Sequence, residues 1–154
     1  MKILILGGTG AMGIHLAEML KFKHEVFITS RKKCEDAAER LHFLQGNAKN
    51  IEFLNEVVSS RWDVIIDFMV YTTDEFENRF NFLLNSTDHY FFLSSARVFS
   101  DSREKITENT ERLLDDTEDF EYLKTDEYAI SKARQENFLA TSEFKNWTII
   151  RPYI

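Results

Sequence analysis

The chain has 154 residues, of which 44% are hydrophobic and 14% aromatic, so we expect one globular domain with a sizeable core rather than a disordered segment. Its formal net charge is -7 and no basic cluster offsets that charge, which argues against a nucleic-acid partner. The single cysteine, Cys34, cannot form an internal disulfide, and no Cys/His pattern indicates a metal site. The N-terminal apolar run is too short for a signal peptide or a membrane span. We therefore expect a cytoplasmic protein with no metal and no membrane partner.

Apolar runs of strand length alternate with helical stretches, which is the pattern of a parallel sheet covered by helices on both faces. The expected strands are Ile3–Leu6, Val26–Thr29, His42–Leu44, Val64–Val70, Tyr90–Leu93 and Thr148–Ile150. The expected helices lie near residues 11–22, 33–40, 50–60, 73–86 and 126–142. We predict a doubly wound α/β fold with strand order 3-2-1-4-5-6 and a ligand crevice at the carboxyl ends of strands one and four.

A polar stretch over residues 100–125 interrupts this alternation. It is longer than the connections that compact domains usually contain. It is either a surface excursion or a loop that faces a substrate.

Four of the five glycines lie in one turn, Gly7-Gly8-Thr9-Gly10-Ala11-Met12-Gly13, between the first expected strand and the first expected helix. Glycine permits a positive φ and the close approach of another group. The helix that begins near Gly10 directs unpaired N–H groups and the positive end of its dipole at the turn, which is how a dinucleotide pyrophosphate is held. The spacing is shifted from the commoner G-x-G-x-x-G fingerprint, yet the order of strand, turn and helix favours a phosphate site over a ligand-free turn.

Tyr128 and Lys132 are four residues apart and therefore share one face of the helix expected over 126–142. A free phenol has a pKa of about 10, and a fixed ammonium nearby favours the phenolate. Tyr128 can then move a proton to or from a substrate hydroxyl while a nicotinamide carries the hydride. The alternative is an ordinary amphipathic helix with an exposed tyrosine and lysine.

With these residues in view, the chain resembles an extended short-chain dehydrogenase/reductase of the NAD(P)-dependent epimerase/dehydratase family, which works largely on nucleotide-activated sugars. The stretches that carry the resemblance are Gly7–Gly13, Phe91–Phe99, Tyr128–Lys132 with Glu136, and Ile150-Arg151-Pro152. They occur in the family's order along the whole chain.

The resemblance implies that Ser95 orients the substrate oxygen, that Tyr128 is the acid or base, and that Lys132 also bonds the nicotinamide ribose. It further implies cofactor contacts at Gly7, Thr9, Gly10, Ala11, Met12, Gly13, Asn47, Phe68, Met69, Val70 and Pro152. Asn47 stands where the family has an acid that meets the adenine amino group, and an amide can still donate and accept. Phe68, Met69 and Val70 occupy a stretch of small residues against the cofactor, or alternatively have only a core role at the end of a strand.

The end of the second expected strand bears on the choice of cofactor. An NAD site places a carboxylate there for the ribose 2′-hydroxyl, whereas an NADP site needs a cation for the 2′-phosphate. Here Ser30 fills the acidic position and Arg31, Lys32 and Lys33 follow. A guanidinium offers a planar fork of donors to a phosphate, so we expect NADP rather than NAD. A solvated basic stretch is the alternative.

In the resembling family the chain continues past the arginine-proline pair into a C-terminal substrate-binding portion, whereas this chain stops at Ile154. We therefore expect residues 1–154 to be an NAD(P)-binding Rossmann domain that lacks this portion and is inactive alone. The expected enzyme is an epimerase or reductase acting on a nucleotide sugar or a related alcohol or carbonyl compound. A dehydratase would place an acid and base pair after Ser95, where this chain has Ala96-Arg97. The other interpretation is a non-catalytic NADP-binding sensor or interaction module, which would not need the Tyr128 and Lys132 pair.

The helices expected over 73–86 and 126–142 have more apolar positions than one sheet face needs. These positions are Phe76, Phe80, Leu83, Leu84, Ala129, Ala133, Phe138 and Leu139. In the resembling family the two helices commonly pair with their copies in a second subunit. We therefore expect some of these side chains to be exposed in a monomer, and we expect a two-fold homodimer.

Overall fold

The computed structural model describes residues 1–34 and 38–153. These residues form a parallel six-stranded sheet in the order β3-β2-β1-β4-β5-β6, which confirms the predicted topology. The strands are β1 Lys2–Leu6, β2 Glu25–Ser30, β3 Leu41–Gln45, β4 Trp62–Asp67, β5 Thr87–Leu93 and β6 Trp147–Ile150.

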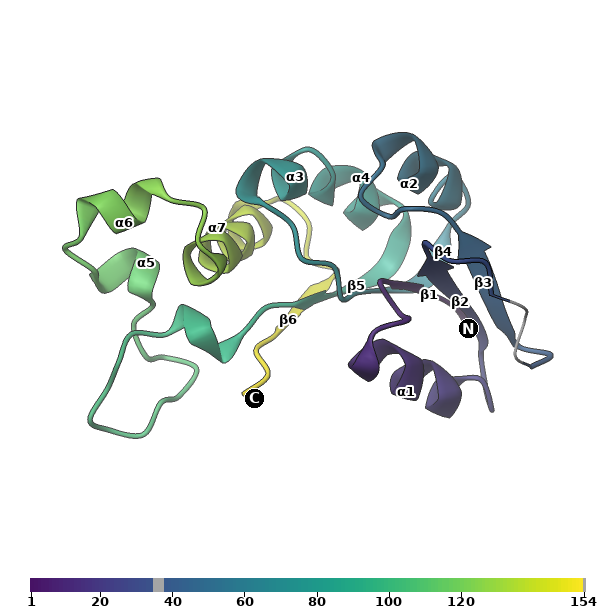
Figure 1. Ribbon diagram of the computed structural model, residues 1–154, viewed down its shortest axis with the longest axis horizontal. Coiled ribbons are helices and arrows are strands. Elements are labelled where there is room, and N and C mark those ends of the chain that lie inside the picture. Colours follow the sequence, from purple (N-terminus) through teal and green to yellow (C-terminus); the bar gives the residue numbers. More distant parts are fainter. Residues whose placement is uncertain (35–37, 154) are drawn as a thin grey trace.

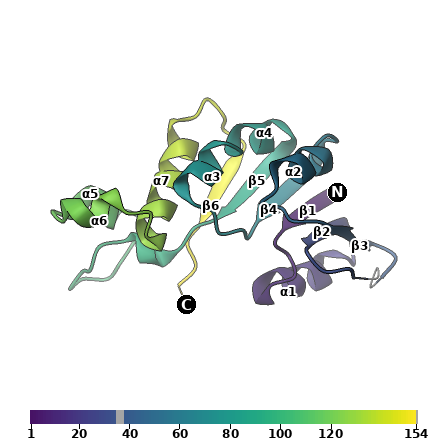
Figure 2. The same ribbon diagram turned by 45° about the horizontal axis from the view of Figure 1, so that its top comes forward.

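Helices lie on both faces of this sheet (Figure 1). They are α1 Ala11–Leu20, α2 Ile51–Val57, α3 Thr73–Glu77, α4 Phe80–Asn85, α5 Leu113–Asp116, α6 Phe120–Lys124 and α7 Tyr128–Thr141, together with the 3-10 turn η1 Ala96–Val98. Helix α1 covers one face, while α2, α3, α4 and α7 lie on the other, and α5 and α6 extend beyond α7 at one end of the molecule (Figures 1 and 2).

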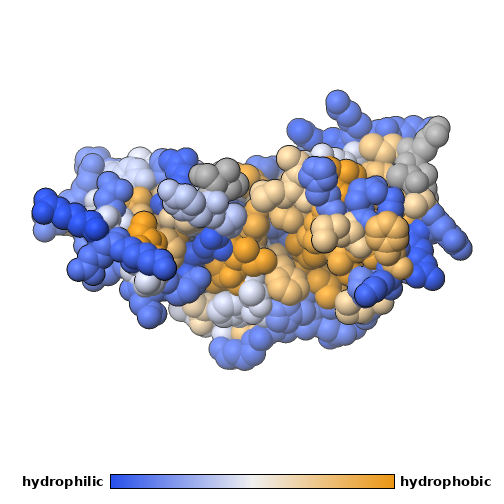
Figure 3. Space-filling view, turned by 90° about the horizontal axis from the view of Figure 1, so that it is seen from below, coloured by the Kyte–Doolittle hydropathy of each residue, from blue (hydrophilic) through white to orange (hydrophobic). Residues whose placement is uncertain are grey.

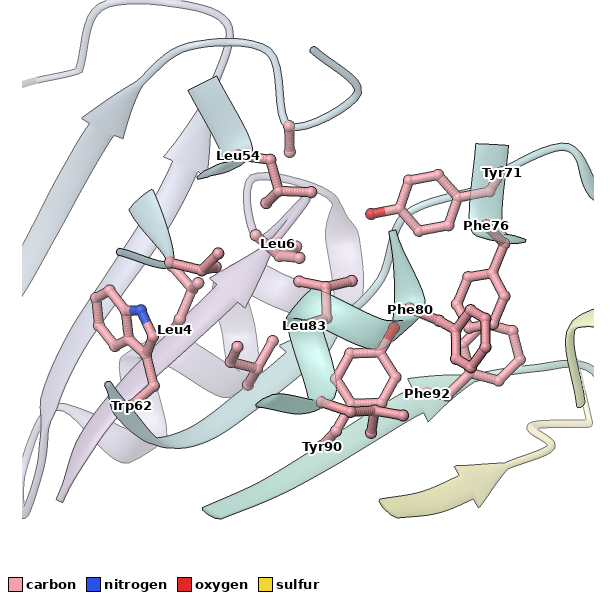
Figure 4. Close-up of a cluster of buried hydrophobic side chains, with 14 of the residues drawn as sticks. Leu4, Leu6, Leu54, Trp62, Tyr71, Phe76, Phe80, Leu83, Tyr90 and Phe92 are labelled. Atoms are coloured by element: carbon pink, nitrogen blue, oxygen red, sulfur yellow. The ribbon is translucent and has the colours of Figure 1, made fainter. Parts of the chain in front are cut away.

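Strand β1 is at the centre of the sheet and separates two cores. Leu4 and Leu6 belong to the larger core, under α2, α3, α4 and α7, whereas Ile3 and Ile5 belong to the smaller core with α1. A parallel strand between two helical layers is buried on both faces, which explains the continuous apolar run of β1. The larger core is strongly aromatic: Phe76 packs against Phe92 with ring centroids 5.0 Å apart and stacks on Phe80 at 5.8 Å (Figure 4).

The helix expected over 73–86 is two helices, because the chain breaks at Asn78 and Arg79. Arg79 has a φ of -131° and is 5% exposed. Its guanidinium lies over the ring of Tyr71 and donates from Nη2 to the carbonyl oxygen of Lys49. The arginine thus turns into the core to support a neighbouring loop, and a continuous helix is interrupted there.

The strand expected over Val64–Val70 ends early, at Asp67. The carboxylate of Asp67 accepts a hydrogen bond of 2.8 Å from the N–H of Met69, two residues on. Such a local side-chain bond replaces the sheet ladder. Phe68, Met69 and Val70 therefore form a loop at the carboxyl end of β4.

The helix expected over 33–40 is not found where the chain is described. Residues 35–37 lie outside the described residues, and Ala38 forms an isolated antiparallel bridge with Leu41. The Ser30 hydroxyl bonds both the N–H and the carbonyl oxygen of Lys32. These bonds favour a turn over the first turn of a helix.

The expectation that apolar side chains of 73–86 and 126–142 would be exposed is wrong. Seven of the eight are buried, and Phe138 is half-buried against the larger core. The break at Arg79 explains this result, because it lets α3 and α4 each turn an apolar side toward the sheet and α7.

Exposed apolar surface lies instead on the sheet face that α1 covers in part. Val64 and Ile66 pack with the smaller core, and the register places Phe91 beside Ile66 on that face. Ile150 of β6 is 43% exposed. Figure 3 views this side and shows apolar side chains gathered at the middle of the molecule, between more polar ends. None of the described helices is both long and apolar enough to cross a membrane.

The close packing of the glycine turn predicts that alanine substitutions at Gly13 and Gly10 change the stability by different amounts. A Cβ on Gly13 would lie 2.5 Å from the Cα of Gly8, whereas a Cβ on Gly10 would meet only the carbonyl oxygen of Gly7, at 3.6 Å. We expect Gly13→Ala to lower the free energy of unfolding by about 1–3 kcal/mol. Gly10→Ala is the matched control and should change it by less than about 0.5 kcal/mol. Urea denaturation measures both, and equal losses would contradict this packing.

Candidate active site

Two clefts open at the carboxyl ends of the strands. The first, here called the glycine cleft, has a volume of about 610 Å³ and is lined by Gly7, Thr9, Gly10, Arg31, Asn47 and residues 68–70 among others. Gly7 follows β1 and residues 68–70 follow β4. The crevice is therefore at the carboxyl ends of strands one and four, as predicted.

The glycines of the turn have separate structural tasks. Gly7 has a φ of +70°, a conformation that L side chains rarely adopt. Gly8 and Gly13 are buried against each other and bring α1 close to β1. Gly10 is the N-cap of α1, and a Cβ there would project into nearly open space. Thr9 and Gly10 line the glycine cleft, Ala11 is exposed at the start of α1, and Gly13 lines neither cleft.

The N-terminus of α1 suits an anion. The 10-residue helix has no side-chain cap and no acidic residue in its first turn. Its first N–H groups therefore have no helical partner, and the positive end of the dipole faces the turn. A Cβ-free cradle at Gly10 in front of these groups fits a diphosphate, which is the group that a dinucleotide cofactor would place there.

The end of β2 places Arg31 and Ser30 differently. Arg31 lines the glycine cleft, whereas Ser30 is 4% exposed and its hydroxyl bonds the backbone of Lys32. Thr29 was not among the predicted contacts, yet it lines the cleft and its Oγ1 accepts a 3.0 Å bond from the Gly7 N–H. The alternation of side chains along a strand is the signal that separates Thr29 from Ser30.

The predicted cofactor contacts Asn47, Phe68, Met69 and Val70 line the same cleft. Asn47 is held by a bond from the Lys49 N–H to its Oδ1, and residues 68–70 form the opposite wall, where Val70 is 54% exposed. Lys49 also lines this cleft and pairs with Glu75 at 2.9 Å. No motif in the sequence pointed to Lys49.

The second cleft, here called the tyrosine cleft, has a volume of about 510 Å³. Its walls come from Met12 of α1, from Leu93 at the end of β5 and residues 94–97 after it, from Tyr128 of α7, and from Pro152 after β6. Asp101, Ile106, Leu113 and Tyr122 also line it. The polar stretch 100–125 therefore faces this cleft instead of being only a surface excursion.

Ser94 and Ser95 point to different partners. Both residues line the tyrosine cleft, and the Ser95 hydroxyl accepts a bond from the Arg97 N–H. Ser94 is 1% exposed and donates to Glu136 Oε1 at 2.6 Å. This arrangement supports Ser95 over Ser94 as the residue that meets a substrate oxygen.

Glu136 is the buried acceptor of several donors. Besides Ser94, Arg151 donates to it from Nε at 2.8 Å and from Nη2 at 2.9 Å, and Arg112 donates from Nη1 at 3.2 Å. A buried carboxylate needs such partners, because an uncompensated buried charge is strongly unfavourable. Glu136 thus joins α7 to the ends of β5 and β6 and to the 100–125 stretch.

Tyr128 is the first residue of α7 and its neighbour Glu127 caps that helix. Glu127 accepts bonds from the Ala129 N–H at 2.7 Å, from the Tyr122 hydroxyl at 2.8 Å and from Arg97 at 3.1 Å. Burial alone would raise the pKa of Glu127, but these donors hold it below its usual value. The cap therefore stays charged and fixes the N-terminus of α7 beside the cleft.

Lys132 lies beneath the two clefts and lines neither. It is 2% exposed, and its Nζ donates to the carbonyl oxygen of Leu93 at 2.8 Å and to that of Met69 at 3.4 Å. Leu93 borders the tyrosine cleft and Met69 the glycine cleft, so the ammonium connects their floors. Burial lowers the pKa of Lys132 from 10.5 to about 8, although the charges of Asp67 and Glu136 act in the opposite direction.

Asp67 is a second buried carboxylate near this lysine. Its Oδ2 accepts a 2.8 Å bond from the Tyr90 hydroxyl. Burial raises the pKa of Asp67, while the Met69 N–H, the Tyr90 hydroxyl and the charge of Lys132 oppose that rise. Within the described part of the chain no group of three His, Cys, Asp or Glu side chains is arranged to hold a metal ion.

A doubly wound sheet with a glycine turn at the end of β1 and a Ser, Tyr and Lys set beside it defines a dinucleotide-binding domain of the dehydrogenase/reductase type. The model of the NAD dependent epimerase/dehydratase family matches residues 3–153. The chain belongs to that family, which uses a nicotinamide cofactor. A comparison with curated protein sequences finds no match.

Solved structures of epimerases and reductases share the fold. A UDP-N-acetylglucosamine 4-epimerase from Methanobrevibacter ruminantium superposes with a TM-score of 0.74 at 17% identity, over 97% of this chain and 54% of its own. A UDP-galactose 4-epimerase superposes with a TM-score of 0.74 at 19% identity, over 98% of this chain and 55% of its own. Vestitone reductase from alfalfa superposes with a TM-score of 0.73 at 17% identity, over 97% of this chain and 55% of its own. The chain spans about half the length of these enzymes.

The lowered pKa of Lys132 predicts a pH-dependent stability. Between pH 8 and 10.5 the unfolded chain binds more protons at this lysine than the folded chain does. The free energy of unfolding of the unmodified chain, minus that of Lys132→Met, should therefore rise with pH in this window by about 1 kcal/mol per pH unit. Urea denaturation of both proteins from pH 7.5 to 9.5 measures this difference.

Lys124→Met is the matched control, because the Lys124 side chain is 71% exposed. Its difference from the unmodified chain should stay flat over the same pH range. A flat difference for Lys132→Met as well would mean that Lys132 has an ordinary pKa in the folded chain.

Proposed function

We propose that residues 1–154 are the cofactor-binding domain of an NADP-dependent epimerase or reductase that acts on a nucleotide sugar or a related alcohol or carbonyl compound. The observation that carries the proposal is that Ser95 and Tyr128 line one cleft while the glycine turn lines the other, with Lys132 bonded to the floor of both. A non-catalytic NADP-binding module is the competing proposal. It would have no use for a tyrosine and a serine in a second cleft.

The residues that would hold the cofactor are those of the glycine cleft. The N-terminus of α1 would meet the diphosphate, Asn47 and residues 68–70 would meet the adenosine half, and Pro152 borders the tyrosine cleft. Arg31 is the residue proposed to select NADP, because a guanidinium pairs with a phosphate monoester through a planar fork of donors. Ser30 contributes by holding the turn that follows, through its bonds to Lys32.

The proposed chemistry of the chain's own residues is proton transfer at the Tyr128 hydroxyl. The nicotinamide, when bound, supplies hydride transfer. Tyr128 takes the proton from a substrate hydroxyl or returns it to a carbonyl oxygen, and Ser95 holds that oxygen by a hydrogen bond. Lys132, one helical turn along α7, holds the carbonyl oxygens of Leu93 and Met69 and so fixes the floor of the two clefts beside Tyr128.

Support for a nucleotide-sugar substrate comes from the names of structurally similar enzymes, the UDP-N-acetylglucosamine and UDP-galactose 4-epimerases. Ala96 and Arg97 after Ser95 favour an epimerase or reductase over a dehydratase, which would need an acid and base pair there. The homodimer also remains a proposal. The exposed apolar face that includes Ile150 is now better support for it than the buried side chains of α3, α4 and α7.

Cofactor preference tests the role of Arg31. We expect NADPH to bind about tenfold or more tightly than NADH, because a charged hydrogen bond contributes about 1.5–3 kcal/mol. Arg31→Ala should remove the difference, whereas Arg103→Ala, an exposed arginine outside the glycine cleft, should preserve it. Fluorescence titration with both cofactors measures this. Equal affinities in the unmodified chain would overturn the choice of NADP.

Tyr128→Phe tests the catalytic proposal. In the longest gene product that contains this sequence, the variant should lose at least about a hundredfold in kcat, because the proton has no acceptor or donor. NADPH affinity should be nearly unchanged. Steady-state kinetics with UDP-hexoses, together with cofactor titration, separates the two effects. Full turnover by Tyr128→Phe would leave the non-catalytic module as the better proposal.

A further inference from the structure

One cation and one anion lie among the side chains that line the tyrosine cleft, Arg97 and Asp101. The Arg97 side chain is 68% exposed, and its guanidinium carbon lies 5.6 Å from the centroid of the Tyr128 ring. Among the described residues only its Nη2 has a side-chain partner, Glu127 at 3.1 Å. The cation is thus held beside the proposed proton donor with its Nε and Nη1 unpaired.

Glu127 does not neutralise Arg97 completely. Its carboxylate also accepts bonds from the Ala129 N–H and the Tyr122 hydroxyl, and it caps the N-terminus of the 14-residue helix α7. A carboxylate with these donors is already stabilised without the arginine. The bond to Glu127 therefore fixes where the guanidinium lies and leaves positive charge available to the cleft.

From the position of Arg97 we propose that the substrate carries a carboxylate on the ring that reacts, as in a uronic acid, and that Arg97 is the residue that selects it. This inference rests on the proposed function, since it takes Tyr128 as the reacting group. A carboxylate matches the planar fork of an arginine. An anion bound beside the Tyr128 ring lies near the reacting carbon, whereas a nucleotide diphosphate lies at the far end of such a substrate.

Asp101 gives the proposal a second, opposite test. It lines the same cleft and repels a carboxylate, while a neutral sugar is not repelled. Removing its charge with Asp101→Asn should therefore strengthen binding of an acid and leave binding of the neutral sugar unchanged. If Asp101 instead accepts hydrogen bonds from sugar hydroxyls, the variant weakens both ligands, and that result contradicts the proposal.

The experiment compares glucuronate with glucose as probes of the longest gene product that contains this sequence, saturated with NADP+, and follows binding by NMR chemical-shift titration. We expect glucuronate to bind about tenfold more tightly than glucose. Arg97→Met should remove the difference, and Arg103→Met, an exposed arginine outside the cleft, should preserve it. Glucose 6-phosphate is a third probe. Tighter binding of glucose 6-phosphate than of glucuronate would mean that Arg97 selects a phosphate, and this result would overturn the proposal.

A separate NADPH titration distinguishes failure of the proposed function from failure of the proposed role of Arg97. Failure to bind NADPH contradicts the proposed function, whereas normal NADPH binding with equal or absent affinity for the two sugars contradicts only the role of Arg97. The NADPH affinity of Arg97→Met also checks that the variant is folded. Should it fail to fold, the comparison of the two sugars in the unmodified chain and in Asp101→Asn still decides the proposal.

Discussion

The tyrosine cleft depends on the buried carboxylate of Glu136. It accepts hydrogen bonds from Ser94 at the end of β5, from Arg151 at the end of β6 and from Arg112 in the 100–125 stretch. These segments are far apart in the sequence. Charged hydrogen bonds in a buried setting are strong and directional, so one carboxylate can fix the relative positions of several loops. Ser95 and Tyr128 share a cleft because their neighbours share this acceptor.

Lys132 plays a comparable part for the two clefts together. Its ammonium bonds the carbonyl oxygens of Met69 and Leu93, and it lies in the field of two buried carboxylates, Asp67 and Glu136. A lysine in this position stabilises the loops after β4 and β5 and keeps a positive charge under the Tyr128 end of α7. Lys132 thus supports the two loops and places a charge at the candidate active site, although its side chain is nearly inaccessible to solvent.

The sequence predicted the sheet order and the crevice at the carboxyl ends of β1 and β4, but not the direction of several side chains. Continuous apolar runs and the glycine turn depend on local chemistry, which a sequence displays directly. The inward turn of Arg79, the burial of Ser30 and the early end of β4 at Asp67 depend on partners elsewhere or on a competing local bond. The role of the 100–125 stretch was undecidable for the same reason, because Arg112 pairs with Glu136, 24 residues away.

The two clefts are lined by different kinds of groups, and this difference decides whether a cleft indicates the cofactor class or the substrate. The glycine cleft includes the positive φ of Gly7 and the N-terminus of α1, backbone features that serve any dinucleotide. The tyrosine cleft is built from side chains, and several of them come from the 100–125 stretch. Backbone features follow from membership of the family, whereas side chains such as Arg97 and Asp101 belong to this chain. Cofactor class can therefore be argued from the family, but the substrate has to be argued from the individual residues that face it.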